Sequence, residues 1–177
     1  NDKIDKKYIT VKSLKSLKQL IKDLEQCDIL SIDLETTSVD PMTAEIVGIS
    51  LSLQPDTGFY IPILYPEKKN NNFGDDDLNV TLSLLKEMLE NSKVKKVGQN
   101  LKYDSLIFSR FGINITGIYF DTMIAAHILN PSARSYKLDA LSLEYLNYSM
   151  VPIEDLIGKG KDQITMDHVS LDKVSYY

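Results

Sequence analysis

Two acidic residues close a short apolar run early in the chain. Asp33 and Glu35 follow the mostly aliphatic residues 29–32, a composition typical of a buried or half-buried strand. Because side chains alternate across a strand, we expect both carboxylates to project from the same face. They repel each other and resist desolvation, and no lysine or arginine lies within the run. The spacing therefore predicts a divalent metal at the pair; the alternative is a strand-end pair that faces solvent.

Asp104 is a third acidic residue at an apolar position. In the helix predicted over residues 100–111 it shares a face with Leu101 and Phe108. An inward aspartate is unfavourable unless a backbone amide, a lysine or a metal satisfies it. Three inward carboxylates form the oxygen-rich set that Mg²⁺ or Mn²⁺ prefers. Two such ions about 3.5–4 Å apart activate a water molecule and stabilise a leaving oxygen in phosphodiester cleavage.

Composition restricts the class of protein and its partners. The chain has 177 residues, of which 43% are hydrophobic and 25% charged, as in an ordinary globular domain. The net charge of −5 argues against a broad basic nucleic-acid-binding face, but not against a compact acidic site in which bound metal reverses the local sign. Cys27 is the only cysteine, which excludes an intramolecular disulfide and a thiolate zinc site.

The chain shows no signal for a membrane or for export. No run of 18 or more apolar residues is present, so we expect no membrane partner. No cationic and then apolar signal sequence opens the chain, and we therefore expect an intracellular protein.

The order of predicted elements indicates an α/β fold. We expect residues 1–12 to be a linker or ragged N-terminus, 13–177 to form one domain, and 66–77 to be a low-complexity surface loop. Strands are predicted at 28–35, 46–53, 59–63, 94–98 and within 113–120, and helices at 13–24, 78–89, 100–111, 121–129, 138–146 and 167–177. A strand meander followed by alternating helices and strands predicts a mixed sheet flanked by helices. Pro62 indicates that the third strand lies at an edge.

Two motifs carry a resemblance to a known family. Asp33-Leu34-Glu35-Thr36-Thr37 resembles the first motif of the DEDD 3′–5′ exonuclease superfamily. Residues 96–104, Lys-Val-Gly-Gln-Asn-Leu-Lys-Tyr-Asp, resemble the second motif of the proofreading domain of family A (DNA polymerase I-like, Klenow-type) DNA polymerases. Weaker matches lie at 120–123, 128–130 and 158–165. The resemblance implies a ribonuclease-H-like sheet, an antiparallel meander plus parallel strands, flanked by helices.

The resemblance also implies a set of catalytic roles. Asp33 would bridge two metal ions, Glu35 would bind the ion that holds the nucleophilic water, and Asp104 would anchor the second ion. Tyr177 stands where the tyrosine type of the superfamily has its third-motif tyrosine, which would hydrogen-bond the attacking water. The fourth acid of that motif would lie four residues further on, beyond the last residue of this sequence. Without the resemblance, the alternative is that Tyr177 is an aromatic residue of the core.

Substrate contacts are implied at six further positions. Thr36 would meet the terminal nucleotide, Val39 would act as an apolar wedge between the last two bases, and Met166 stands where relatives carry a stacking phenylalanine. The remaining residues that would line the strand are Gln99, Asn100 and Tyr103.

The predicted function is metal-dependent 3′–5′ cleavage of single-stranded DNA ends, with Mg²⁺ or Mn²⁺ as two-ion cofactor. A polymerase domain on the same parent chain is the expected partner, and proofreading is the expected role. The alternatives are a catalytically silent DNA-binding module of a polymerase and an exonuclease that trims RNA 3′ ends. The lysine and asparagine bias, taken with the resemblance, predicts a plastid (apicoplast) location.

Overall fold

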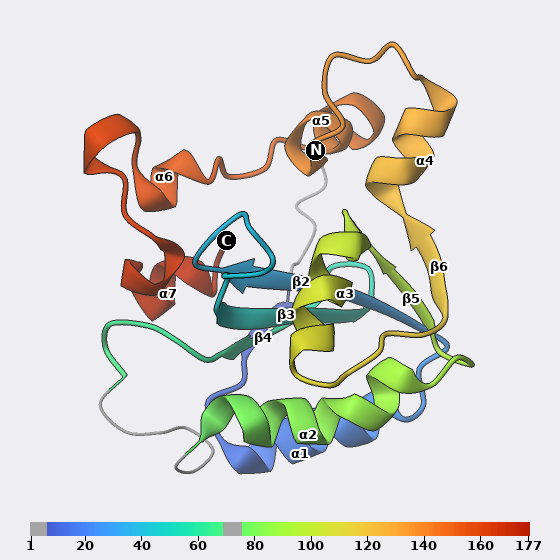
Figure 1. Cartoon of the computed structure of the whole chain (residues 1–177), viewed down its shortest axis with the longest axis vertical. Coiled ribbons are helices and arrows are strands. Elements are labelled where there is room, and N and C mark those ends of the chain that lie inside the picture. Colours follow the sequence, from blue (N-terminus) through green and yellow to red (C-terminus); the bar gives the residue numbers. More distant parts are fainter. Residues whose placement is uncertain (1–6, 69–75) are drawn as a thin grey trace.

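The computed structural model describes residues 7–68 and 76–177. Within them, six strands form one mixed sheet in the order β1-β4-β3-β2-β5-β6. The strands are β1 (Lys7–Thr10), β2 (Ile29–Thr36), β3 (Ile46–Gln54), β4 (Thr57–Pro62), β5 (Lys95–Gly98) and β6 (Ile118–Asp121). The α-helices are α1 (Leu14–Leu24), α2 (Asp77–Glu90), α3 (Leu101–Arg110), α4 (Thr122–Leu129), α5 (Leu138–Leu146), α6 (Glu154–Ile157) and α7 (Leu171–Val174). The predicted α/β class, a mixed sheet flanked by helices, is confirmed (Figure 1).

The sheet combines a meander with a parallel half. The consecutive strands β2, β3 and β4 pair antiparallel. β5 pairs parallel with β2, and β6 pairs parallel with β5, each reached through a connection that contains a helix. β2 therefore lies in the interior of the sheet, between β3 and β5. An interior strand with a partner on each side holds the side chains at its end in a well-defined position.

One face of the sheet carries the main core. Leu30, Ile32 and Leu34 of β2 are buried on this face against α1, α2 and α3. α1 presents leucines at helical spacing and begins at a capping box in which Ser13 and Ser16 bond each other's backbone amides. In Figure 1, α1 and α2 lie side by side below the sheet, and α3 crosses in front of it.

The opposite face is covered by the C-terminal part of the chain. Met166, Val169, Leu171 and Val174 pack there in a second buried cluster against Val47 and Tyr60, residues of β3 and β4. These four residues belong to a 3₁₀ turn at Met166–His168, the segment after it, and α7. The single helix predicted over 167–177 is wrong, because the chain bends at 169–170 to follow this face.

Two sequence predictions about the first half of the chain are corrected by the sheet. Lys7–Thr10, predicted as part of a linker, pairs in parallel with β4, while residues 1–6 lie outside the described residues. β4 is consequently an interior strand, not an edge strand. Pro62 pairs with Gly48 of β3 but is tolerated because β1 pairs only with Thr57 to Tyr60, so on the β1 side no strand accepts a hydrogen bond from this position.

The predicted loop over 66–77 falls partly outside the described residues, since residues 69–75 are not described. At its end the prediction is wrong, because Asp77 is the buried first residue of α2. The Asp77 carboxylate lies 2.8 Å from the Lys68 ammonium, which ties the two described ends of this segment together.

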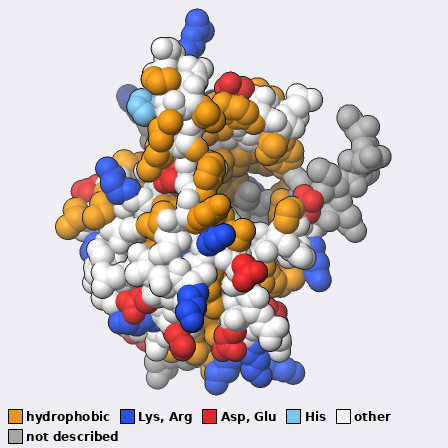
Figure 2. Space-filling model, turned by 90° about the vertical axis from the view of Figure 1, so that its right-hand side faces the viewer, with side chains coloured by type: hydrophobic (Ala, Val, Ile, Leu, Met, Phe, Trp, Pro, Cys, Tyr) orange, Lys and Arg blue, Asp and Glu red, His pale blue; other side chains and the backbone are white. Residues whose placement is uncertain are grey.

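Helices α4 and α5 bury little of their apolar surface. A groove of about 480 Å³ between them is lined almost wholly by apolar side chains, among them Phe120, Leu129, Leu141 and Leu146. Figure 2 shows hydrophobic side chains gathered on the face of the molecule that carries these elements. None of the described helices has both the length and the apolar composition needed to cross a membrane.

Asp121 fixes the N-termini of two helices at once. As the N-cap of α4, its carboxylate accepts hydrogen bonds from the amides of Met123 and Ile124 at 2.9 and 3.3 Å. It also accepts from the amides of Asn100 and Leu101 at 3.1 and 2.7 Å. α3 has no side-chain cap of its own, so Asp121 substitutes for one.

We predict that Asp121→Ala lowers the free energy of unfolding by about 2–4 kcal/mol, because four helix-terminal amides lose their acceptor. Urea unfolding of parent and variant measures this. Asp172→Ala, which removes an exposed aspartate in α7, is the control and should change stability by less than about 0.5 kcal/mol. Equal stability losses in the two variants would contradict the double-cap role.

Candidate active site

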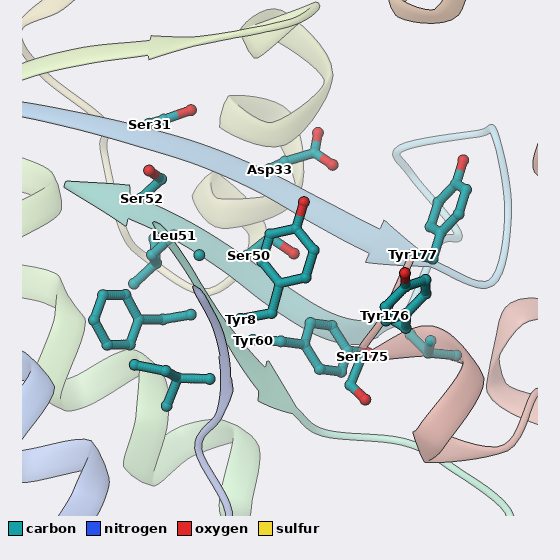
Figure 3. Close-up of a pocket in the computed structure, with 14 residues that line it drawn as sticks. Tyr8, Ser31, Asp33, Ser50, Leu51, Ser52, Tyr60, Ser175, Tyr176 and Tyr177 are labelled. Carbon is teal, nitrogen blue, oxygen red and sulfur yellow. The ribbon is translucent and has the colours of Figure 1, made fainter. Parts of the chain in front are cut away.

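The acidic pair lies at the end of β2, on the face opposite the main core. Ser31, Asp33 and Glu35 alternate with buried residues of the core face. This alternation confirms that Asp33 and Glu35 project from the same face, as Figure 3 shows for Ser31 and Asp33. The register between β2 and β3 shifts between Glu35 and Thr36, and such an irregularity bends the strand where it leaves the sheet.

Asp104 reaches the same strand through a gap in the sheet. β2 and β5 pair only from Ile29 to Ser31 and then diverge, which leaves the backbone of Leu34 without a neighbouring strand on that side. Asp104, 2% exposed, fills this gap and accepts a hydrogen bond from the Leu34 amide at 3.2 Å. The backbone-amide partner considered from the sequence is thus present, and it holds the third carboxylate next to the first two.

The three carboxylates interact electrostatically. Burial raises the pKa of Asp33 to about 6, although part of its side chain reaches solvent at the mouth of the site. Burial and then the charge of Asp33 raise the pKa of Glu35 to about 7. Burial, again followed by the charge of Asp33, raises the pKa of Asp104 to about 8. No lysine or arginine contributes to any of these shifts, so the site carries negative charge that described cationic side chains do not offset.

Two tyrosines border the acidic pair. Burial, followed by the charges of Glu35 and Asp33, raises the pKa of Tyr177 to about 12, and Tyr177 lines the same pocket as Asp33. Tyr60 was not predicted; burial and then Glu35 raise its pKa as well. Its ring covers Gly48, the cross-strand neighbour of Glu35, and a side chain at position 48 would collide with that ring. Figure 3 shows Tyr177 beside the end of β2, and Tyr60 on β4.

The position of Tyr60 follows from strand register. Ser50 pairs with Asp33 on one side and with Tyr60 on the other, so the three residues form a row across three strands. Residues directly opposite each other share a face of the sheet. Alternation within one strand gives the face of each residue relative to its neighbours, but the sequence contains no signal for this cross-strand row.

A groove of about 550 Å³ opens beside the pair and collects most of the predicted substrate residues. It is lined by Glu35, by the segment from Thr36 to Val39, by the start of α3, and on the far side by residues 153–166. The predicted residues along it are Thr36, Val39, Asn100, Tyr103 and Met166. Val39 is 95% exposed at its rim, whereas Met166 is 4% exposed and offers only an edge of its side chain.

Gln99 lies outside this group. Its side-chain amide donates to the carbonyl of Tyr136 at 2.8 Å, and its oxygen accepts from the Thr122 hydroxyl. It is not among the residues that line the groove. The structure therefore gives Gln99 a bridging position between β5 and α4, and its contact with a nucleic-acid strand stays a prediction.

The donor set of the site suits a hard divalent cation. Asp33, Glu35 and Asp104 supply only oxygen ligands, and each pKa is raised in a way that a bound cation would reverse. In the part of the chain that the structure describes, no three acidic, histidine or cysteine side chains already stand in a metal-holding arrangement. The residue types fit such an ion, and binding would require their carboxylates to turn toward one another.

A known family matches most of the chain. The sequence profile of the family described as 3′–5′ exonuclease, of the DNA polymerase A type, matches residues 8–176. DNA polymerase I of Rhizobium leguminosarum is 33% identical over 185 residues, covering 96% of this chain and 18% of the relative. DNA polymerase I of Pseudomonas aeruginosa is 32% identical over 164 residues, covering 89% and 17%. The chain therefore spans less than a fifth of the length of these relatives.

Solved structures share the fold at low sequence identity. Brucella melitensis NrnC superposes with a TM-score of 0.64 at 19% identity, covering 97% of this chain and 72% of that protein. The same protein with bound Mg²⁺ gives a TM-score of 0.56 at 21% identity, covering 81% and 61%. Escherichia coli RNase D, an exoribonuclease involved in structured RNA processing, gives 0.63 at 18% identity, covering 84% and 36%.

Neutralising Asp104 is expected to stabilise the metal-free protein in a pH-dependent way. Its pKa in the fold, about 8, lies above its usual 3.8, so the fold favours the protonated acid. The stability that this proton contributes is complete near pH 4 and is lost as the pH rises through 8. The amide introduced by Asp104→Asn stays neutral, so we predict similar stability at pH 4 and a gain of about 1–3 kcal/mol at pH 8.

Urea unfolding in EDTA at the two pH values measures this gain, with Asp172→Asn as the control for removing an exposed carboxylate. Added Mg²⁺ should raise the stability of the parent more than that of Asp104→Asn. A variant that is less stable than the parent at pH 8 in EDTA would show that Asp104 is satisfied as an ordinary buried anion.

Proposed function

Because the chain belongs to the 3′–5′ exonuclease family, we propose that it hydrolyses the terminal phosphodiester of single-stranded DNA and releases nucleotides from the 3′ end. The observation that carries this proposal is the group of three electrostatically coupled carboxylates at the end of β2, beside an open groove. A substrate strand in the groove would present its last phosphate to these carboxylates. A site of this charge would repel that phosphate unless cations neutralised it.

We propose two Mg²⁺ or Mn²⁺ ions as cofactor, held by Asp33, Glu35 and Asp104. When bound, such ions lower the pKa of a water molecule and neutralise charge on the leaving oxygen. The Mg²⁺ in one structure of the same fold supports a divalent ion at this fold. Asp33, at the mouth of the site and coupled to both other acids, would hold these ions together with Glu35 and Asp104.

The chain's own residues position the attacking water. Glu35 offers carboxylate oxygens that can accept a hydrogen bond from that water and fix its orientation. The pKa of Tyr177, about 12, keeps its hydroxyl protonated at neutral pH, so this residue donates or accepts a hydrogen bond and does not act as a base. Tyr60, beside Glu35, is suited to the same kind of support.

The groove residues would hold the strand end. Val39, almost fully exposed at the rim, is the proposed wedge between the last two bases. The hydroxyl groups of Thr36 and Tyr103 lie 2.6 Å apart and form a polar wall for the terminal nucleotide. Asn100, at the start of α3, and Met166, across the groove, complete the proposed contacts.

We further propose that this activity serves proofreading. The relatives are DNA polymerases of which this chain spans 18% and 17%, so a polymerase domain on the same parent chain is the proposed partner. The plastid location predicted from the sequence bias stays a prediction.

The proposal is tested with a 3′-labelled single-stranded DNA oligonucleotide and Mg²⁺, using the chain and a version that continues past Tyr177 in its parent. We predict stepwise shortening from the 3′ end, none in EDTA, and a rate loss on the order of 10³-fold in Asp33→Ala. Lys18→Gln on α1, far from the site, is the control and should cleave like the parent.

Other outcomes distinguish the alternatives. Faster shortening of an RNA oligonucleotide of the same sequence would favour RNA end trimming. Binding of the DNA without cleavage, in both versions, would favour a catalytically silent module. Equal rates for Asp33→Ala and the parent would contradict the assigned site.

A further inference from the structure

The segment between β2 and β3 forms one wall of the groove. It runs from residue 37 to 45, and its first residues, Thr37, Ser38 and Val39, line the groove with Glu35. In Figure 1 it is the blue loop at the arrowhead of β2. The position of this loop relative to the acids therefore sets the width of the groove where a terminal nucleotide would bind.

The loop is folded upon itself but joined to the sheet only at its base. Asp40 organises the tip of the loop. Its carboxylate accepts a hydrogen bond from the Met42 amide at 2.9 Å, and its backbone carbonyl accepts one from the Ala44 amide at 2.9 Å. At the base of the loop, Thr37 and Glu45 form two hydrogen bonds. The Thr37 amide donates to the Glu45 carbonyl at 3.1 Å, and the Glu45 amide donates to the Thr37 hydroxyl at 3.0 Å. These local bonds define the shape of the loop but not its angle to the sheet.

Two side chains of α3 fix that angle. The Tyr103 hydroxyl donates to the carbonyl of Ser38 on the groove side. Arg110 donates through one guanidinium nitrogen to the carbonyls of Pro41 at 2.9 Å and Ala44 at 2.6 Å. Residues seven apart lie two turns apart on one face of a helix, so α3 holds the loop at both flanks.

The same helix carries Asp104. Because α3 anchors the loop and presents this acid, the distance between the groove wall and the acids is set within one rigid element. Arg110 itself does not line the groove; it lies on the other side of the loop, beside Glu45. It can influence a bound strand only through the loop.

We infer that Arg110 is a positioning residue, which holds the loop over 37–45 in register with the acids so that the 3′-terminal nucleotide fits between Val39 and the carboxylates. This inference rests on the proposed exonuclease function and names a determinant of substrate affinity in the same site. The interaction is charge-assisted and shared by two carbonyls, the stronger kind of hydrogen bond.

The variants are Arg110→Gln, which removes the charge and shortens the side chain, and Arg110→Lys, which keeps the charge on a different donor geometry. Lys18→Gln is the control for loss of one positive charge. Hydrogen exchange of peptides covering 37–45 measures the loop directly. The consequence is measured as affinity for a short single-stranded DNA with a cleavage-resistant 3′ linkage, and as KM and kcat on the cleavable strand. Parent and variants are all made in whichever of the two versions, the chain or its extension past Tyr177, cleaves DNA. If neither cleaves, all are made in the full parent protein.

We expect Arg110→Gln to speed exchange within 37–45, with α1 and α2 unchanged, and to raise KM and Kd about 5- to 10-fold while kcat changes less than about twofold. KM rises while kcat stays nearly constant if the loop contributes equally to the binding of the substrate and of the transition state. Arg110→Lys should recover part of the affinity, and Lys18→Gln should match the parent.

Three results would overturn the inference. Unchanged exchange in 37–45 would show that Arg110 does not anchor the loop. Faster exchange with parental KM and Kd would show that the loop does not position the strand. A parent protein that neither binds nor cleaves DNA would refute the proposed function and, with it, a role for Arg110 in substrate affinity. An active parent whose Arg110 variants behave like it would refute only the role of Arg110.

Discussion

Desolvation and mutual repulsion of three neighbouring carboxylates form the constraint on which this structure depends, with Asp104 buried, Glu35 half-buried and Asp33 at the mouth of the site. Asp33, Glu35 and Asp104 each lose hydration in the fold, and Asp33 raises the pKa of the other two. No described cationic side chain relieves them, so the protein tolerates an unfavourable charge arrangement that a main core on the other face of the sheet must outweigh. A site kept at this cost is typical of a place where a cation or substrate supplies the missing interaction.

The architecture concentrates that charge by three means. The interior position of β2 fixes Asp33 and Glu35, and the divergence of β2 from β5 opens the gap that Asp104 fills. Asp121 then holds the start of α3 by its two leading amides. α3 is thus the element that connects the sheet, the third acid and the groove, which explains why it also contacts the loop after β2.

Local patterns predicted much of this site, and long-range pairing decided the rest. Strand alternation was sufficient to put Asp33 and Glu35 on one face, and helical periodicity to turn Asp104 inward. The sequence could not show that Lys7–Thr10 pairs with β4, because a four-residue strand gains its stability from a partner distant in sequence. The neighbourhood of Tyr60 depends on the same register. The C-terminal helix was overestimated because periodicity does not reveal where packing against the sheet bends the chain.

Manganese anomalous scattering from crystals grown with Mn²⁺ shows whether these acids hold a divalent ion, because it locates the ion without relying on activity. The version that continues past Tyr177 and the present chain should both be examined. We expect anomalous density in contact with Asp33 and with Glu35 or Asp104, and none in Asp33→Asn crystals. Manganese bound only elsewhere, or carboxylates that remain apart with no ion between them in both proteins, would contradict this expectation.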